Sequence, residues 1–442
     1  MKLFIFLSSL LAIATAAPLV DRALPPSLDP FYDPPSGWES QPVGSILKTR
    51  SVVTATASIV ANLAIDGTQL LYRTAGPAGE ALSTVVTILR PAGAKKDRLL
   101  AYTFAEDSNA RKCAPSYNLQ FASVPTNLIT TVENFLVQAA LAQGWTVTVP
   151  DYQGPNSAFI AGQLEGRAVL DGIRATLKYP NLNLNNPKIA VWGYSGGAAA
   201  AGWTGALQPS YAPELNMIGV AQGGTPAYLP GTARFIDGTA LAGLAFGALA
   251  GMGSAYPAFE TRIQELLTSQ GKQEIVRVRE RCATDNIFAY AGQKILETYV
   301  TTGTAALDDP IIKPILDQQT MGAPSTPRVP VYVYHAANDD VVPYADVPGM
   351  VDSWCNDGAT VEFVTDVAPS TNHFAMEILH FPAVLDWLKG RFDGTINPSG
   401  CSRKEISQSL LGSTTLAESV GGNSAAAAVN AANAALQASP LA

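Results

Sequence analysis

The chain has 442 residues, of which 47% are hydrophobic and 14% are charged, against about 25% charged residues in an average soluble protein. Its length exceeds one ordinary domain, and this composition can bury a large core. The net charge of −8 argues against nucleic acid as a partner.

The amino terminus has the pattern of a secretory signal peptide. Lys2 precedes an apolar run over residues 3–13, and Ala14-Thr15-Ala16-Ala17 offers a small-residue cleavage site. We predict a signal peptide over residues 1–17 and a secreted, extracellular protein. The apolar run is too short to span a bilayer stably, as is the glycine-rich stretch 240–253, so we expect no membrane anchor.

Strand and helix patterns alternate after an extended, proline-rich segment at residues 25–42. Helical patterns at 132–143 and 162–177 separate runs typical of buried strands. This alternation predicts an α/β fold with a mostly parallel, doubly wound sheet and helices on both faces. The expected strands are residues 70–73, 85–89, 99–104, 145–149, 189–192, 217–220, 331–334 and 361–364.

One strand runs directly into a G-x-S-x-G motif. Residues 188–192 are followed by Gly193-Tyr194-Ser195-Gly196-Gly197 and then by a run of small residues, 198–203, typical of a tightly packed helix. This is the layout of a nucleophile elbow, in which the serine occupies a strained turn and glycines let strand and helix pass closely. We therefore predict Ser195 as a nucleophile. The alternative is a glycine-rich loop.

Acyl transfer also needs donors for the developing oxyanion. The backbone N–H of Gly196, next to the nucleophile, supplies one. The second is expected from the loop that follows the strand at 99–104, at residues 105–108. Spacing does not choose among these residues, and the alternative for Asp107 is that it simply caps the following turn.

About a hundred residues of helical pattern interrupt the alternation, far more than a crossover needs. We interpret residues 228–325 as an inserted helical cap. Its stretch 239–251 is rich in glycine and alanine, which suits either a narrow channel for an acyl chain or tight helix packing.

A serine nucleophile needs an imidazole to take its proton, and the chain has three histidines. His335 lies in a strand-like run before the loop expected to carry the acid, and His380 lies within a predicted helix over 375–388. His373 follows a polar loop and opens that helix. By elimination we predict His373 as the general base.

The acid is expected in the loop after the strand at 331–335, where Asp339 and Asp340 are adjacent. Neighbouring side chains point in different directions, so only one can face His373. We favour Asp339 and expect Asp340 to cap the loop or face solvent. The order Ser195, Asp339, His373 is that of α/β-hydrolases.

The four cysteines are expected to form disulfides, because exported thiols usually pair. Cys113, Cys282, Cys355 and Cys401 allow three pairings, and spacing does not separate them. The chain shows no zinc signature and no phosphate-binding loop, so we expect no cofactor and no metal.

Several longer motifs together resemble the fungal secretory lipases of the yeast lipase A type, within the α/β-hydrolase superfamily. The resemblance extends from about residue 29 to residue 394. Its motifs are Glu106-Asp107, 113–117 (CAPSY), 159–162 (FIAG), 165–166 (EG), 170–174 (LDGIR), 193–197 (GYSGG), 211–216 (YAPELN), 223–226 (GGTP), 335–336 (HA) and 342–344 (VPY).

The resemblance implies a secreted serine lipase or esterase that hydrolyses carboxylic esters of fatty acids, including triacylglycerols. Its expected partner is an ester or lipid substrate, dissolved or at an oil–water interface; the oligomeric state stays open. The site residues that it implies are the triad Ser195, Asp339 and His373, the oxyanion donors Asp107 and Gly196, and the disulfides Cys113–Cys282 and Cys355–Cys401.

The expected layout is a core over 18–227 and 326–400, interrupted by a cap or lid over 228–325. Residues 401–442 form a tail, alanine-rich at 424–442, that is either a flap over the site or a disordered end. Alternative functions are a carboxylesterase of short soluble esters and a secreted serine peptidase of the same fold, which would need a charged anchor for a peptide terminus. A non-catalytic binding protein would usually lack a member of the triad.

Overall fold

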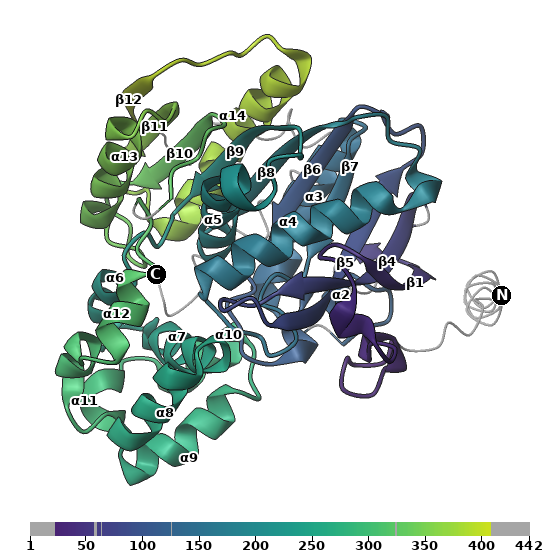
Figure 1. Ribbon diagram of the computed structural model, residues 1–442. Coiled ribbons are helices and arrows are strands. Elements are labelled where there is room, and N and C mark those ends of the chain that lie inside the picture. Colours follow the sequence, from purple (N-terminus) through teal and green to yellow (C-terminus); the bar gives the residue numbers. More distant parts are fainter. Residues whose placement is uncertain (1–22, 57–59, 63, 125, 323–324, 408–442) are drawn as a thin grey trace, which may run out of the picture.

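The computed structural model describes residues 23–407, apart from 57–59, 63, 125 and 323–324 (Figure 1). The predicted signal peptide and the alanine-rich stretch 424–442 lie outside these residues. A ten-stranded sheet of order β1-β4-β5-β7-β6-β8-β9-β10-β11-β12 forms the centre. Its strands are β1 (Ile46–Val52), β4 (Ile65–Ala75), β5 (Ala81–Pro91), β6 (Arg98–Thr103), β7 (Thr146–Pro150), β8 (Lys188–Tyr194), β9 (Met217–Gly223), β10 (Val331–Ala336), β11 (Val361–Asp366) and β12 (Cys401–Ile406).

The sheet is parallel from β7 to β12, and its other end, formed by β1, β4 and β5, is antiparallel. A separate small ribbon pairs β2 (Ala55–Thr56) with β3 (Val60–Ala61). All parallel strands therefore end at one edge of the sheet, where loops after different strands can meet.

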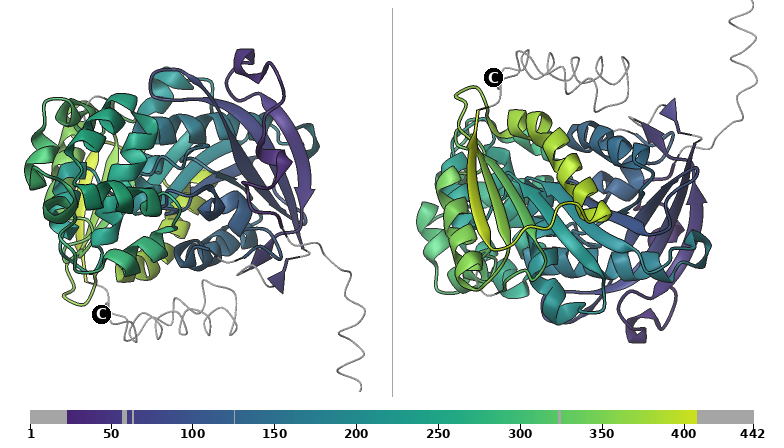
Figure 2. Two further views of the ribbon diagram at one scale, coloured as in Figure 1. Left: turned by 90° about the horizontal axis from the view of Figure 1, so that it is seen from below. Right: turned by 90° about the horizontal axis from the view of Figure 1, so that it is seen from above.

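Helices cover both faces of the sheet (Figure 2). Side chains alternate along each strand: Leu99 and Ala101 of β6 join the core under α4, α5 and α13, whereas Leu100 and Tyr102 join the core under α3 and α14. This arrangement confirms the predicted α/β class. The covering helices are α3 (Leu128–Ala142), α4 (Gly162–Lys178), α5 (Gly196–Tyr211), α13 (Val347–Asn356) and α14 (His373–Asp393).

The long segment between β9 and β10 is helical and lies together at one end of the core (Figure 1). It comprises α6 (Leu229–Ile236), α7 (Ala242–Ala255), α8 (Pro257–Leu266), α9 (Ser269–Val278), α10 (Ala283–Tyr290), α11 (Ile295–Tyr299), η5 (Gly303–Asp308) and α12 (Ile312–Asp317). The remaining short elements are α2 (Pro115–Asn118), η1 (Pro30–Tyr32), η2 (Trp38–Ser40), η3 (Arg111–Cys113), η4 (Pro180–Leu182) and η6 (Tyr344–Asp346).

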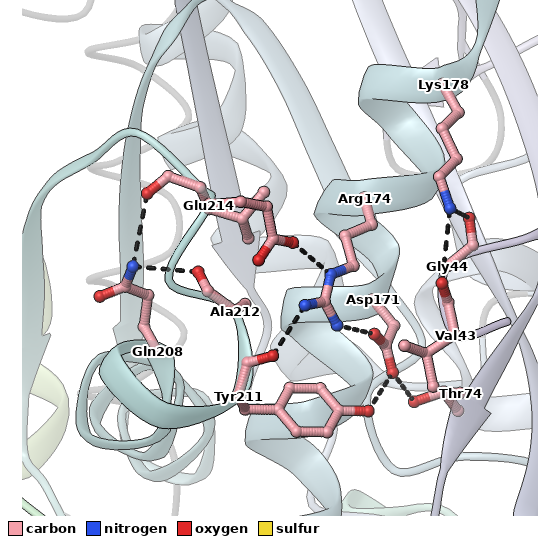
Figure 3. A network of polar contacts seen from close by, with 11 residues as sticks. Val43, Gly44, Thr74, Asp171, Arg174, Lys178, Gln208, Tyr211, Ala212 and Glu214 are labelled. Atoms are coloured by element: carbon pink, nitrogen blue, oxygen red, sulfur yellow. Dashed lines mark hydrogen bonds and ion pairs between the residues drawn. The ribbon is translucent and has the colours of Figure 1, made fainter.

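A buried polar network ties α4 to its neighbours (Figure 3). The Asp171 carboxylate accepts hydrogen bonds from Thr74 Oγ1 on β4 and Tyr211 OH at the end of α5, both at 2.8 Å. It also accepts one from Arg174 Nη1 at 2.9 Å, and Arg174 Nε reaches Glu214 Oε1 at 2.6 Å. These contacts hold α4 and the end of α5 in register with the sheet, because a buried carboxylate is stable only where donors surround it.

The carboxyl-terminal part of the described chain adds an edge strand. Residues 401–406, which the sequence analysis assigned to the tail, form β12 and pair in parallel with β11. The disulfides join Cys113 to Cys282 and Cys355 to Cys401, the pairs that the resemblance implied. The second of them links β12 to the end of α13. Among the described residues, no helix combines the length and apolarity needed to cross a bilayer.

Candidate active site

Ser195 lies at the sharp turn between β8 and α5, as the motif predicts. Its backbone has φ 53° and ψ −124°, a region that is costly for a residue with a side chain. The turn closes because the following helix comes directly against β6: a Cβ at Gly197 would overlap the carbonyl of Thr103. A Cβ at Gly193 would overlap the carbonyl of Gly197. The glycines of the motif are therefore required by the close passage of strand and helix.

His373 and Asp339 meet Ser195 at the carboxyl edge of the sheet. His373, the first residue of α14, places Nε2 2.9 Å from Ser195 Oγ. Its Nδ1 lies 2.7 Å from Asp339 Oδ2, in the loop after β10. The other oxygen of Asp339 accepts the backbone N–H groups of Val341 and Val342 at 2.9 and 2.7 Å. The structure thus brings the three residues into one chain of hydrogen bonds.

Asp340 caps backbone rather than facing His373 with its side chain, which is one of the two roles expected for it. Its Oδ1 accepts the backbone N–H of His373 at 3.1 Å, at the start of α14. Asn372 caps the same helix, its side chain accepting from Ala375 N at 3.0 Å. The two adjacent carboxylates therefore divide the work: one faces the imidazole ring, and the other holds the backbone that carries it.

The remaining histidines are buried away from Ser195. His380, in the middle of α14, lies 2.9 Å from Tyr332 OH through Nε2. His335, on β10, points its Nε2 toward Val342 O at 3.1 Å and lies 3.3 Å from Asp339 Oδ2. Sequence reasoning set His335 aside as a base and missed its contact with Asp339.

Charges within the site stabilise one another despite burial. Burial opposes charge on the His373 ring, but the Asp339 carboxylate beside it outweighs this effect, and the pKa of His373 is raised. Burial likewise opposes charge on Asp339, yet the charge and hydrogen bond of His373 hold the pKa of that carboxyl below its usual value. An ionised acid beside a readily protonated base is the state that can accept a proton from Ser195.

Asp107 and Gly196 lie next to each other beside Ser195. Both border the same hollow as the serine, and a Cβ at Gly196 would overlap the Asp107 carboxyl group. Asp107 has φ 46°, so its loop turns sharply after β6. Burial raises the pKa of the Asp107 carboxyl to about 7. The loop expected to hold the second oxyanion donor is therefore beside Ser195.

Several buried side chains brace this loop, and sequence reasoning did not find them. Glu133 on α3 accepts the backbone N–H of Ala105 at 2.8 Å. The Ser108 hydroxyl accepts the N–H of Ala283, the first residue of α10, at 2.9 Å. The disulfide Cys113–Cys282 joins the same two segments. A glutamate inside an apolar helix such as α3 is the signal that could have identified the first brace, because buried carboxylates need partners.

An apolar hollow leads to Ser195. Its walls come from α6 and α7, from the loop after β10, and from the turn before α4. Apart from Asp107, Ser195, Gly196 and Thr232, it is bordered by Phe159, Ile160, Pro226, Leu229, Ala233, Ile236, Leu244, Ala245, Ala248, Val341 and Val342. Such a surface suits a hydrocarbon chain.

The small residues of α7 serve both purposes considered for them. On one side, Cβ atoms at Gly243 and Gly251 would overlap the backbone of Asn286 and Phe159, so glycine permits tight packing there. On another side, Ala245 and Ala248 border the hollow.

Comparisons with known proteins agree with this geometry. Residues 119–400 match the family model described as secretory lipase. The chain is 39% identical to a secreted triacylglycerol lipase of Malassezia furfur, over 84% of this chain and 81% of that protein. It is 37% identical to lipase 5 of Candida albicans, over 85% and 83%. The crystal structure of Candida antarctica lipase A matches with a TM-score of 0.84 and 32% identity, covering 92% of this chain and 96% of that one. The chain therefore belongs to the secretory lipase family and has the α/β-hydrolase fold of that structure.

Proposed function

We propose that the protein is a secreted lipase that hydrolyses carboxylic esters of fatty acids, triacylglycerols among them. The observation that carries the proposal is the hydrogen-bonded chain from Ser195 through His373 to Asp339, which opens onto an apolar hollow. The family and the names of its secreted triacylglycerol lipases support the substrate class and the extracellular location.

In the first half of the proposed reaction, Ser195 Oγ attacks the carbonyl carbon of the ester while His373 Nε2 takes the hydroxyl proton. The carbonyl oxygen becomes an oxyanion, held by the backbone N–H groups of Asp107 and Gly196. Asp339 stays ionised and stabilises the imidazolium. The intermediate then expels the alcohol, which receives its proton from His373, and leaves the acyl group on the serine.

The second half repeats these steps with water. His373 takes a proton from the water, whose oxygen attacks the acyl carbonyl carbon. The bond to Ser195 Oγ breaks, and His373 returns the proton to the serine. The carboxylic acid leaves, and the resting site is restored.

We further propose that residues 228–325 act as a cap that supplies most of the acyl-binding surface. Residues of α6 and α7 form much of the apolar wall. Rates on an ester series from acetyl to oleoyl, dissolved and emulsified, test the substrate class. A maximum at long, emulsified chains supports a lipase, whereas a maximum at acetyl or butyryl supports a carboxylesterase of soluble esters.

Replacing the nucleophile tests the proposal directly. Ser195→Ala is expected to lower kcat for a nitrophenyl ester by about 10⁴- to 10⁶-fold with an unchanged fold. Ser210→Ala, which removes an exposed hydroxyl from the same helix, is the matched control and should keep full activity. More than a tenth of the wild-type rate in Ser195→Ala would show that another residue is the nucleophile.

A further inference from the structure

His335 is a buried imidazole in contact with the acid of the site. It lies on β10, is fully buried, and places Nε2 3.1 Å from the carbonyl oxygen of Val342. The same nitrogen is 3.3 Å from Asp339 Oδ2, the oxygen that faces His373. Its other nitrogen, Nδ1, is buried without a hydrogen-bond partner.

These contacts determine where the ring carries its proton. Both groups that face Nε2 are acceptors, so Nε2 carries the hydrogen, and Nδ1 is the bare nitrogen. Burial lowers the pKa of His335, and the Asp339 carboxylate only partly offsets it. The titratable groups that act on the ring are Asp339, on the following loop, and His373 on α14; the ring of Tyr344 lies beside it at 6.0 Å between centroids. His335 is therefore mostly neutral at the pH at which an ordinary imidazole is half charged.

We propose that His335 is a positioning residue of this site, whose Nε2–H holds the loop of Asp339 and orients the carboxylate toward His373. The inference rests on the proposed function. The bond to Val342 O ties the loop after β10 back to the strand. In the same loop, the backbone N–H groups of Val341 and Val342 donate to Asp339 Oδ1. Nε2 of His335 lies 3.3 Å from Asp339 Oδ2, close enough for the partial positive charge of its N–H to act on that oxygen. His335 thus acts on both oxygens, on one through the loop and on the other through space.

The proposal predicts a change in turnover and in pH dependence. Without the N–H, the Asp339 charge is less balanced, so His373 binds its proton more tightly and the acidic limb of kcat/KM moves to higher pH. The groups that face His373 are Asp339 and Asp340 on the loop, Glu377 on its own helix, and Asp107 across the hollow. None of these is removed by a change at His335.

Three substitutions separate the N–H from the bulk of the ring. His335→Phe keeps the ring but has no donor, and is expected to lower kcat by about 10- to 100-fold, as loss of an orienting partner does at metal sites, with KM little changed. Its acidic limb should rise by about half a pH unit. His335→Gln can place an amide N–H where Nε2 lies and should recover most of both properties. His335→Asn, whose amide is too short to reach Val342, should behave like His335→Phe.

A purely structural role would give a different pattern. It would lower the melting temperature of the glutamine and phenylalanine variants alike and leave the acidic limb in place. A folded His335→Phe with wild-type kcat and pH profile would overturn the proposal, as would a glutamine variant as poor as phenylalanine. If Ser195→Ala is inactive while His335→Phe is unaffected, only this inference fails; an active Ser195→Ala contradicts the proposed function itself.

A measurement on the wild-type protein stands even if a variant does not fold. The chain has only three histidines, so ¹⁵N NMR resolves each imidazole, with His380→Gln for assignment. At pH 7.5, above the ordinary pKa of an imidazole, the spectrum should show His335 neutral with its proton on Nε2. A neutral His335 with its proton on Nδ1 and a bare Nε2 would refute the proposed contact.

Discussion

Asp151 should make the protein less stable as the pH rises, and one substitution should remove that effect. This carboxyl follows β7 directly and is buried, with Oδ1 accepting the backbone N–H of Ser116 at 2.8 Å. Its Oδ2 lies 2.5 Å from Ser116 Oγ, which in turn lies 2.7 Å from Tyr32 OH. Burial raises the pKa of Asp151 to about 7, although the bonds from Ser116 and the charge of Arg111 act in the opposite direction.

The size of the effect follows from the two pKa values of Asp151. In the unfolded chain the carboxyl titrates near its ordinary value of about 3.9. Because the folded pKa is higher, this group contributes its full stability below pH 4 and loses it as the pH rises toward and through 7. Between pH 5 and pH 8 the loss amounts to about 2–3 kcal/mol, at about 1.4 kcal/mol for each pH unit over which only the unfolded chain ionises.

Asp151→Asn has the shape of the protonated acid, with a carbonyl to accept from Ser116 N and an amide to donate to Ser116 Oγ. Urea unfolding of both proteins at pH 5 and pH 8 measures the difference between them. The other buried carboxyls titrate in both proteins and cancel. The variant should gain about 2–3 kcal/mol relative to the wild type over this interval. Parallel stability curves for the two proteins would refute the reasoning.

Other substitutions test the turn, the acid and the hollow. Asp339→Asn should lower kcat about 10⁴-fold, because the amide favours the tautomer of His373 that carries its proton on Nε2 and cannot take one from Ser195. Asp340→Asn should keep most of the turnover, and equal losses for the two variants in steady-state assays would contradict the assignment. Gly197→Ala should destabilise the fold by about 2 kcal/mol or more in thermal unfolding, because its Cβ meets backbone, while Gly349→Ala, with open space around its Cβ, should not. Ala248→Phe should narrow the hollow and shift the preferred ester from long toward short chains; an unchanged chain-length profile would place the acyl group elsewhere.

Local sterics and chain order explain why the sequence predicted so much of the site region. The turn at Ser195 brings a strand and a helix into close contact, and this contact requires the glycines around the serine. A motif of five residues is therefore enough to predict the turn. The alternation of strands and helices, confirmed in the sheet, places the loops with Asp339 and His373 at the same edge as the serine. The structure brings all three within hydrogen-bond distance.

What the sequence did not predict depends on contacts between distant segments. Glu133 reaches the loop after β6 from α3, and no local pattern links the two. His335 has the sequence pattern of an ordinary strand residue. Its contact with the Asp339 carboxylate forms only because the loop after β10 folds back beside the strand. Strand β12 was missed because its residues are mostly exposed and charged, without the apolar alternation by which strands are recognised.

The composition of β12 has a consequence for the protein in concentrated solution. Among the described residues, β12 is the last strand of the sheet, and an edge strand can pair with a strand of another chain. The strand carries the exposed residues Arg403, Lys404 and Glu405, and its disulfide at Cys401 attaches it to α13. We therefore expect this exposed charge to disfavour pairing of β12 with a second molecule, as charged residues on edge strands do in general.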